Sequence, residues 1–209
     1  MAIFITFEGG EGCGKSTQAR ALYKHVSRKG LPVVLSQEPG GTPLGKELRR
    51  HLKRTEGTEI SPLAELFLFA ASRAQLVEKV IIPSLESGAI VICDRYSDST
   101  TAYQGYGRGL DLDTVQTINT TATGGISPDL VILLDLPVEI GLSRKGAIKG
   151  ARFEREEIAF HQRVRNGFLR MAKTDPERWL VIDAGVSRSE VSRIIRDKVG
   201  ELIQQRGSR

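Results

Sequence analysis

A glycine-rich segment near the start of the chain carries residue types suited to binding phosphate. Residues 9–16, called the phosphate loop below, read Gly-Gly-Glu-Gly-Cys-Gly-Lys-Ser and fit the pattern G-x-x-x-x-G-K-[ST]. Glycines let backbone N–H groups converge on an anion, and the N-terminus of a following helix adds partial positive charge. Lys15 can reach the β- and γ-phosphates, and the Ser16 hydroxyl can bind Mg²⁺. The pattern predicts a nucleoside triphosphate site and leaves open whether the protein is a kinase, a GTPase or a motor.

Features further along the chain favour a kinase. GTPases read guanine with the tetrapeptide N-K-x-D, which does not occur in this sequence. A kinase that acts on a small molecule needs arginines that contact two phosphate groups, an acceptor pocket and a basic lid that excludes water. Asp94 and Arg95 end a predicted strand, where a parallel sheet gathers its ligands. Asp94 can hold Mg²⁺ through water and Arg95 can contact both phosphates, although an ion pair at the strand end is the alternative.

A basic segment at residues 144–155 is the candidate lid. It holds five Lys or Arg residues and one acid, with glycines at 146 and 150. A glycine-hinged, arginine-rich loop between helices can close over a triphosphate. The alternative is a basic loop that simply faces water.

Five short apolar runs must supply the strands that position these residues. They are rich in β-branched residues and continuous, which is typical of strands buried on both faces of a sheet. We predict strands at 3–7, 32–36, 89–94, 130–135 and 179–183. We predict helices at 15–29, 44–54, 62–82, 111–121, 138–145, 153–173 and 187–205. This alternation predicts an α/β fold with a five-stranded, mainly parallel sheet and helices on both faces.

Length and composition describe an ordinary globular protein. The chain has 209 residues, 40% of them hydrophobic and 26% charged, and we expect one domain over 1–209. Cys13 and Cys93 lie far apart without a C-x-x-C motif, which favours a reducing compartment over a disulfide scaffold. No apolar run approaches the roughly 20 residues of a membrane span, so we expect a cytoplasmic protein without a membrane partner. The net charge of +5 suits small phosphorylated ligands and does not require nucleic acid. Surface positions are expected for His25, His51 and His161.

Six ordered motifs resemble the thymidylate kinase family, which phosphorylates dTMP to dTDP. They occupy residues 8–17, 38–42, 69–73, 94–96, 102–105 and 152–154, and the resemblance extends from 4 to about 183. It implies a P-loop nucleoside monophosphate kinase-like fold. It also implies transfer of the γ-phosphoryl group of ATP to dTMP, with Mg²⁺, for dTTP synthesis. The expected partners are ATP, dTMP and a second copy of the chain in a homodimer, and not nucleic acid.

On the donor side, the resemblance assigns residues to ATP, to catalysis and to the metal. The implied ATP contacts are Gly9, Gly10, Glu11, Gly12, Cys13, Gly14, Lys15, Ser16, Thr17 and Arg144. The implied catalytic residues are Lys15, Arg95 and Arg152, with Arg152 as a lid arginine that approaches the transferring phosphate. The phosphate loop has no arginine, which in this family goes with an arginine in the lid, as in bacterial enzymes. The implied Mg²⁺ ligands are Ser16 and, through water, Asp94.

The acceptor side is assigned in the same way. The implied dTMP contacts are Glu11, Pro39, Arg49, Phe69, Arg73, Arg95, Thr100, Tyr103 and Gln104. Phe69 would stack on thymine and Arg73 would hydrogen-bond it, since i, i+4 spacing puts both on one helix face. Arg49 and Arg95 would grip the acceptor phosphate, and Glu11 would accept from the sugar 3′-hydroxyl. Tyr103 would crowd the sugar 2′ position, with Thr100 and Gln104 near the far edge of the base.

Two positions depart from the family's pattern. Gln37 stands where Arg is common, and Ala151 stands where Asp often precedes the lid arginine. The second departure leaves Arg144, Lys149 and Arg155 as competitors of Arg152. Three other interpretations stay open at this point: a nucleotide kinase with another acceptor, a nucleotide-binding regulatory module, and a nucleic-acid-binding protein.

Overall fold

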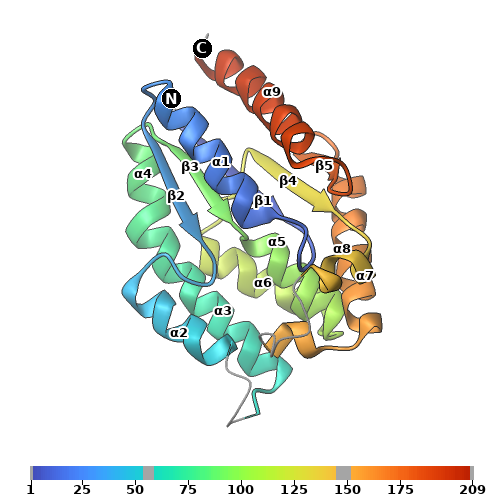
Figure 1. Ribbon diagram of the computed structural model, residues 1–209. Helices are drawn as coiled ribbons and strands as arrows, with labels where there is room; N and C mark the ends of the chain where they lie inside the picture. Colours follow the sequence, from blue (N-terminus) through green and yellow to red (C-terminus); the bar gives the residue numbers. More distant parts are fainter. Residues whose placement is uncertain (1, 54–58, 145–151, 208–209) are drawn as a thin grey trace.

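A computed structural model describes residues 2–53, 59–144 and 152–207 of the chain. The expected helix ends at Arg54 and Lys145, and Lys149 and Ala151 of the expected lid, lie outside these ranges. Within them, five strands form one sheet in the order β2-β3-β1-β4-β5 (Figure 1). The strands are β1 (Ile3–Glu8), β2 (Val33–Gln37), β3 (Ile90–Asp94), β4 (Leu130–Asp135) and β5 (Trp179–Asp183). Every neighbouring pair is parallel, which confirms the predicted sheet.

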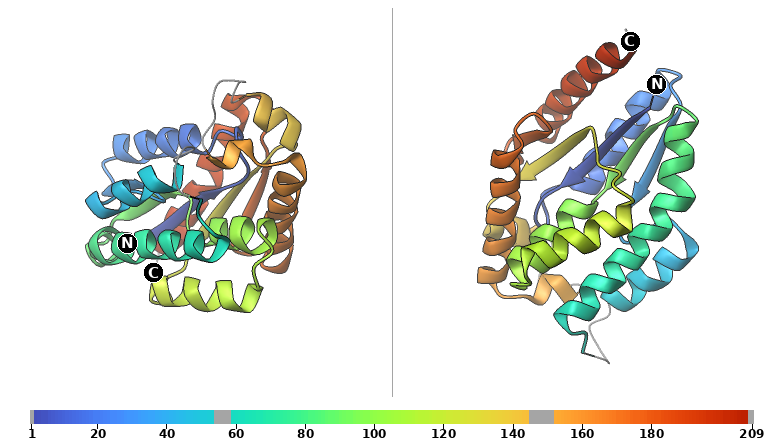
Figure 2. Two further views of the ribbon diagram at one scale, coloured as in Figure 1. Left: turned by 90° about the horizontal axis from the view of Figure 1, so that it is seen from below. Right: turned by 180° about the vertical axis from the view of Figure 1, so that it is seen from behind.

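Helices cover both faces of this sheet (Figures 1 and 2). The α-helices are α1 (Lys15–Arg28), α2 (Pro43–Lys53), α3 (Pro62–Leu76), α4 (Ile82–Glu86), α5 (Ser97–Thr100), α6 (Leu112–Thr123), α7 (Val138–Ser143), α8 (Ile158–Thr174) and α9 (Arg188–Gly207). Two π-helical segments, η1 (Val77–Ile81) and η2 (Thr101–Gly107), and one 3₁₀ segment, η3 (Arg152–Arg155), complete the described elements. Helices α1 and α9 pack on one face through residues such as Leu22 and Ile195. The other face is covered by η1, η2 and α8.

The long helix that begins at Pro62 continues past Pro83, where its end was predicted. In η1 the N–H of Ile82 bonds to the carbonyl of Val77, five residues earlier. Proline in an α-helix lacks a donor, and its ring clashes with the carbonyl four residues before it. The wider π turn just before Pro83 relieves this conflict, so the helix extends to Glu86.

A second difference lies directly after β3. No helix was predicted between β3 and residue 111, yet α5 and η2 occupy residues 97–107. Serine, threonine and glycine dominate this stretch, and their helix propensity is low. Burial stabilises these helical turns despite the low propensity, since Ala102, Tyr103 and Gln104 are almost completely covered by neighbouring elements.

The predicted surface position of His161 was also wrong. His161 is only 4% exposed, although a surface position was expected. Its pKa is lowered by burial, so the imidazole is neutral at pH 7. Cys13 and Cys93 are buried and unpaired, as expected. Among the described residues, no helix is long and apolar enough to cross a membrane.

Candidate active site

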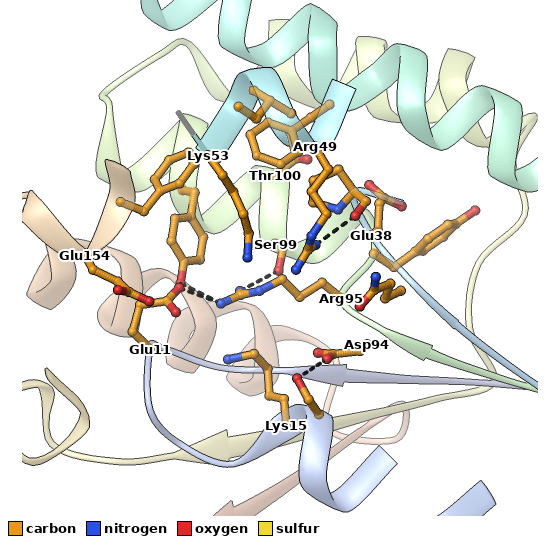
Figure 3. A pocket seen from close by; sticks show the side chains of 18 of the residues that line it. Glu11, Lys15, Glu38, Arg49, Lys53, Asp94, Arg95, Ser99, Thr100 and Glu154 are labelled. Carbon is orange, nitrogen blue, oxygen red and sulfur yellow. Dashed lines mark hydrogen bonds and ion pairs between the residues drawn. The ribbon is translucent and has the colours of Figure 1, made fainter. Parts of the chain in front are cut away.

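A cavity of about 360 Å³ opens at the carboxyl ends of the strands, where doubly wound sheets bind ligands. Figure 3 shows Lys15 and Arg95 projecting into it, with Arg49 and Lys53 reaching in from α2. The predicted site residues that line the cavity are Glu11, Gly12, Gly14, Lys15, Ser16, Thr17, Pro39, Arg49, Phe69, Arg73, Asp94, Arg95, Thr100, Tyr103, Gln104 and Arg144. Gly9, Gly10, Cys13 and Arg152 are not among the lining residues. The sequence motifs therefore converge on one cavity, with four exceptions.

The phosphate loop forms the floor of one end of the cavity. Gly9 has φ +138°, and a Cβ there would stand 2.5 Å from the Leu134 carbonyl oxygen, so only glycine fits. Gly14 precedes α1 with φ 95° and gives the helix no side-chain cap. The first N–H groups of α1 are therefore available to an anion.

Lys15 lies across the loop that precedes it. Its Nζ donates to the carbonyl oxygens of Gly9 at 3.0 Å and Gly10 at 2.5 Å. Cys13 Sγ is 3.4 Å from the same nitrogen. The ammonium group is thus held at the phosphate end by loop carbonyls that a phosphate oxygen can replace.

Ser16 and Asp94 meet beside this loop. The Ser16 hydroxyl donates to Asp94 Oδ2, although the two residues come from α1 and the end of β3. Both are hard oxygen ligands of the kind that Mg²⁺ prefers. Among the described residues, no group of three or more His, Cys, Asp or Glu could hold a metal. The pair fits Mg²⁺ that completes its shell with waters and substrate phosphates.

Arg95 connects the phosphate loop to the opposite wall. Its Nη1 donates to the Gly9 carbonyl at 3.2 Å and to Ser99 Oγ at 3.0 Å. Its Nη2 donates to Glu11 Oε1 at 2.7 Å and to the Tyr103 hydroxyl at 3.0 Å. Burial alone would lower the pKa of Arg95, but the Tyr103 hydroxyl and the Glu11 carboxylate hold it above its ordinary value. The guanidinium is therefore always charged where it lines the cavity beside the phosphate loop.

The backbone of Arg95 is strained, and Glu8 holds it in place. Arg95 has φ 76°, a left-handed conformation that non-glycine residues rarely adopt and that costs about 1–3 kcal/mol. The buried Glu8 carboxyl group accepts the Tyr96 N–H at 2.7 Å and the Ser99 hydroxyl at 2.5 Å. Since Ser99 in turn accepts from Arg95, Glu8 supports both the backbone and the side chain of Arg95.

The titration of Glu8 predicts how stability changes with pH. Burial, with a smaller contribution from Asp98, raises the pKa of Glu8 from 4.5 to about 8. Between these values the folded protein keeps a proton that the unfolded chain has released, so the free energy of unfolding falls as pH rises. The slope from Glu8 reaches up to about 1.4 kcal/mol per pH unit. Urea unfolding across this interval is expected to show a flatter profile for Glu8→Gln, which does not ionise, and identical profiles would contradict the assignment.

The far end of the cavity is aromatic and polar. Phe69 of α3 lines it, and its ring centroid lies 6.0 Å from that of Phe153. Arg73 is fully buried and donates to Asn119 at 2.6 Å and to Thr100 at 2.5 Å, and it forms an ion pair with Glu38. Its Nε is buried and has no hydrogen-bond partner among the residues that the structure describes. This end thus has an aromatic ring, Phe69, on which a ligand can stack, and a guanidinium group, that of Arg73, whose Nε–H can still donate a hydrogen bond.

Arg152 lies away from the phosphate loop. Its Nη2 is 2.8 Å from Glu65 Oε2 and donates to the Ile60 carbonyl at 3.0 Å. The structure does not bring Arg152 together with Lys15 and Arg95, the other two predicted catalytic residues. Of its competitors, Arg144 lines the cavity and Arg155 is exposed, while Lys149 lies outside the described residues.

Several lining residues received no role from the sequence. They are Gln37, Glu38, Leu52, Lys53, Tyr96, Ser99, Phe153 and Glu154. Four of them, Glu38, Tyr96, Phe153 and Glu154, lie inside the recognised motifs, so the motifs could have indicated these residues. Lys53 and Ser99 carry no such signal, because their place depends on how α2 and α5 pack.

The fold and the site define a class. A parallel sheet leads through a phosphate loop into α1, and arginines and an aromatic pocket face that loop; this is the arrangement of a P-loop nucleoside monophosphate kinase. Residues 7–195 match the family model described as thymidylate kinase. The chain belongs to the thymidylate kinase family.

Individual relatives agree with this assignment. The chain is 56% identical over 204 residues to a thymidylate kinase of Dehalococcoides mccartyi, with 98% of this chain and 99% of that protein covered. It is 46% identical to a thymidylate kinase of Citrifermentans bemidjiense, covering 99% and 95% of the two chains. The crystal structure of thymidylate kinase from Ehrlichia chaffeensis superposes with a TM-score of 0.76 at 35% identity, covering 94% of this chain and 98% of that chain.

Proposed function

We propose that the protein transfers the γ-phosphoryl group of ATP to dTMP, giving dTDP and ADP, and so serves dTTP synthesis. The observation that carries this proposal is the position of Arg95. It joins the phosphate loop, through the Gly9 carbonyl and the Glu11 carboxylate, to Ser99 and Tyr103 on the opposite wall. Family membership and the relatives' names supply the choice of dTMP as acceptor.

The chemistry rests on positioning and charge. A phosphate oxygen of the acceptor is already anionic near pH 7, so the transfer needs no strong general base. Lys15 and Arg95 neutralise the charge that spreads over the transferring group, and Arg152 joins them after leaving Glu65. Ser16, and through water Asp94, would hold Mg²⁺, which when bound would supply further neutralisation of the phosphates. Arg144 packs on adenine from the end of α7.

The acceptor side binds the deoxynucleotide by shape and hydrogen bonds. Phe69 stacks on thymine, while Arg73 and Thr100 contact its polar edges. Tyr103 crowds the sugar 2′ position, and its hydroxyl donates to Glu11 at 2.8 Å, which fixes the carboxylate for the 3′-hydroxyl. Arg49, held by the Pro39 carbonyl at 2.8 Å, grips the acceptor phosphate with Arg95.

Coupled ADP release with a panel of acceptors tests this function. With ATP and Mg²⁺, we expect release that depends on dTMP. dUMP should be a poor but detectable acceptor, because one methyl group is worth only about 1–3 kcal/mol. dCMP should be much worse. A different preferred nucleotide, or ADP release that ignores every acceptor, would refute the proposal.

We further propose that the protein is a cytoplasmic homodimer. The buried, unpaired cysteines support a reducing compartment. Leu63 and Phe67, one turn apart on α3, are 47% and 54% exposed and form an apolar stripe of the kind that a second copy covers.

A charge in this stripe is expected to break the dimer. Phe67→Glu would place an unpaired charge in the interface and shift the mass measured by light scattering from two chains to one. Val186→Glu changes an apolar residue of similar exposure (42%) on another segment and should leave the mass unchanged. A dimeric Phe67→Glu protein would exclude this stripe as the interface.

A further inference from the structure

We propose that Glu65 is a positioning residue for base selection: it orients the Gln104 side chain so that the amide oxygen faces the acceptor base. The inference rests on the proposed function, since it concerns how a pyrimidine is chosen at the acceptor site. Glu65 lies on α3 and has no exposed surface.

Glu65 is fixed by two arginines. Arg108 donates from Nε to Oε1 and from Nη2 to Oε2, both at 3.2 Å, so it holds the plane of the carboxylate. Arg152 Nη2 approaches Oε2 at 2.8 Å. Arg108 keeps both carboxylate oxygens paired even when Arg152 leaves, and a carboxylate paired in this way only accepts hydrogen bonds.

This acceptor determines the orientation of the neighbouring amide. Gln104 Nε2 donates to Glu65 Oε1 at 2.8 Å, and Gln104 is 1% exposed. Turning the amide over would place Gln104 Oε1 against Glu65 Oε1. Both oxygens are acceptors, so no hydrogen bond could form between them. Glu65 therefore permits one of the two amide orientations.

The permitted orientation leaves the amide oxygen for the ligand. Gln104 lines the cavity with Phe69 and Thr100. Among the described residues, its side chain hydrogen-bonds to Glu65 through Nε2, and its Oε1 accepts no hydrogen bond. Thymine and uracil carry a proton on N3, which this oxygen can accept. Cytosine has a bare N3 that itself accepts, so the two acceptors would oppose each other. An unmade buried hydrogen bond of this kind costs roughly 1–3 kcal/mol.

The test is the ratio of kcat/KM for dTMP to kcat/KM for dCMP. Glu65→Gln presents either an oxygen or an N–H to Gln104, which frees the amide to turn over and donate to cytosine. We expect the ratio to fall at least about fivefold, with a higher KM for dTMP and a lower KM for dCMP. Any change in how Arg152 is held alters both substrates alike and cancels from the ratio. An unchanged ratio overturns the proposal.

A double-mutant cycle shows whether Glu65 acts through Gln104. Gln104→Met removes the amide, so adding Glu65→Gln in that background should change the ratio by less than about twofold. A fall as large as in the wild-type background would overturn the proposal. If Glu65→Gln does not fold, the double variant Glu65→Gln, Arg108→Met removes one charge of each sign. Its ratio is then compared with that of Arg108→Met alone.

The proposed function and this inference fail in different ways. If the wild-type protein shows no dTMP-dependent ADP release, the proposed function itself fails. If the wild-type protein is selective and Glu65→Gln is equally selective, only this inference is overturned.

Discussion

Replacing Lys15 with alanine is expected to lower kcat at least about 100-fold, a loss comparable to removing one preorganised donor from a transition-state site. Lys15 is 7% exposed, and its Nζ is held by the Gly9 and Gly10 carbonyls at the phosphate end of the cavity. No other ammonium group of α1 reaches this position, since Lys24 is exposed on the same helix. The measurement is steady-state ADP release at saturating dTMP.

Two controls separate chemistry from folding in this prediction. Lys24→Ala removes the same charge from the exposed part of α1 and should retain normal kcat. Thermal unfolding should show that Lys15→Ala remains folded, because the lost contacts are three hydrogen bonds within the loop, two to carbonyls and one to Cys13 Sγ. A folded Lys15→Ala protein with nearly normal turnover would refute the role of the lysine.

Arg95→Ala is expected to reduce kcat/KM at least about 100-fold, equivalent to about 2.7 kcal/mol of transition-state stabilisation. The side chain makes four hydrogen bonds that span both walls of the cavity, and its charge faces the position where two phosphate groups would meet. Its loss removes that charge and also releases Glu11, leaving a carboxylate that repels the phosphates. Both kcat and the KM for dTMP should change if, as proposed, Arg95 contacts donor and acceptor.

Arg95→Lys distinguishes charge from geometry at this position. A lysine keeps the charge but lacks the planar guanidinium group. In Arg95, one guanidinium nitrogen donates to Gly9 and Ser99, and the other donates to Glu11 and Tyr103. We expect most of the loss to remain in Arg95→Lys. Retention of more than about a tenth of the wild-type kcat/KM by Arg95→Ala would show that the guanidinium is not used in transfer.

Local sequence patterns were enough to predict the strands of the sheet and the phosphate loop. Residues 3–17 contain an apolar β-branched run, spaced glycines and a helix start, and each of these properties acts over a few residues. The strand ends then place Asp94 and Arg95 beside the phosphate loop, because parallel strands align their carboxyl ends.

Long-range packing decided what the sequence could not predict. The π-helical η2, which carries Tyr103 and Gln104, forms in a stretch of low helix propensity and is stabilised by burial against α8. The ion pair of Arg152 with Glu65 joins residues far apart in the chain, and neither has a neighbour in the sequence that signals the contact. His161 is buried although Gln162 and Arg163 follow it, because it lies on the same face of α8 as the buried Val164 and Phe168.

Transfer of label from ATP radiolabelled at its γ-phosphate addresses the central claim, that the cavity brings a donor and an acceptor phosphate end to end. With wild-type protein and dTMP, the label should appear in dTDP in a one-to-one ratio with the ADP formed, and Lys15→Ala should abolish nearly all of it. Label that appears as inorganic phosphate, or that enters dTDP equally well with Lys15→Ala, would contradict this account of the site.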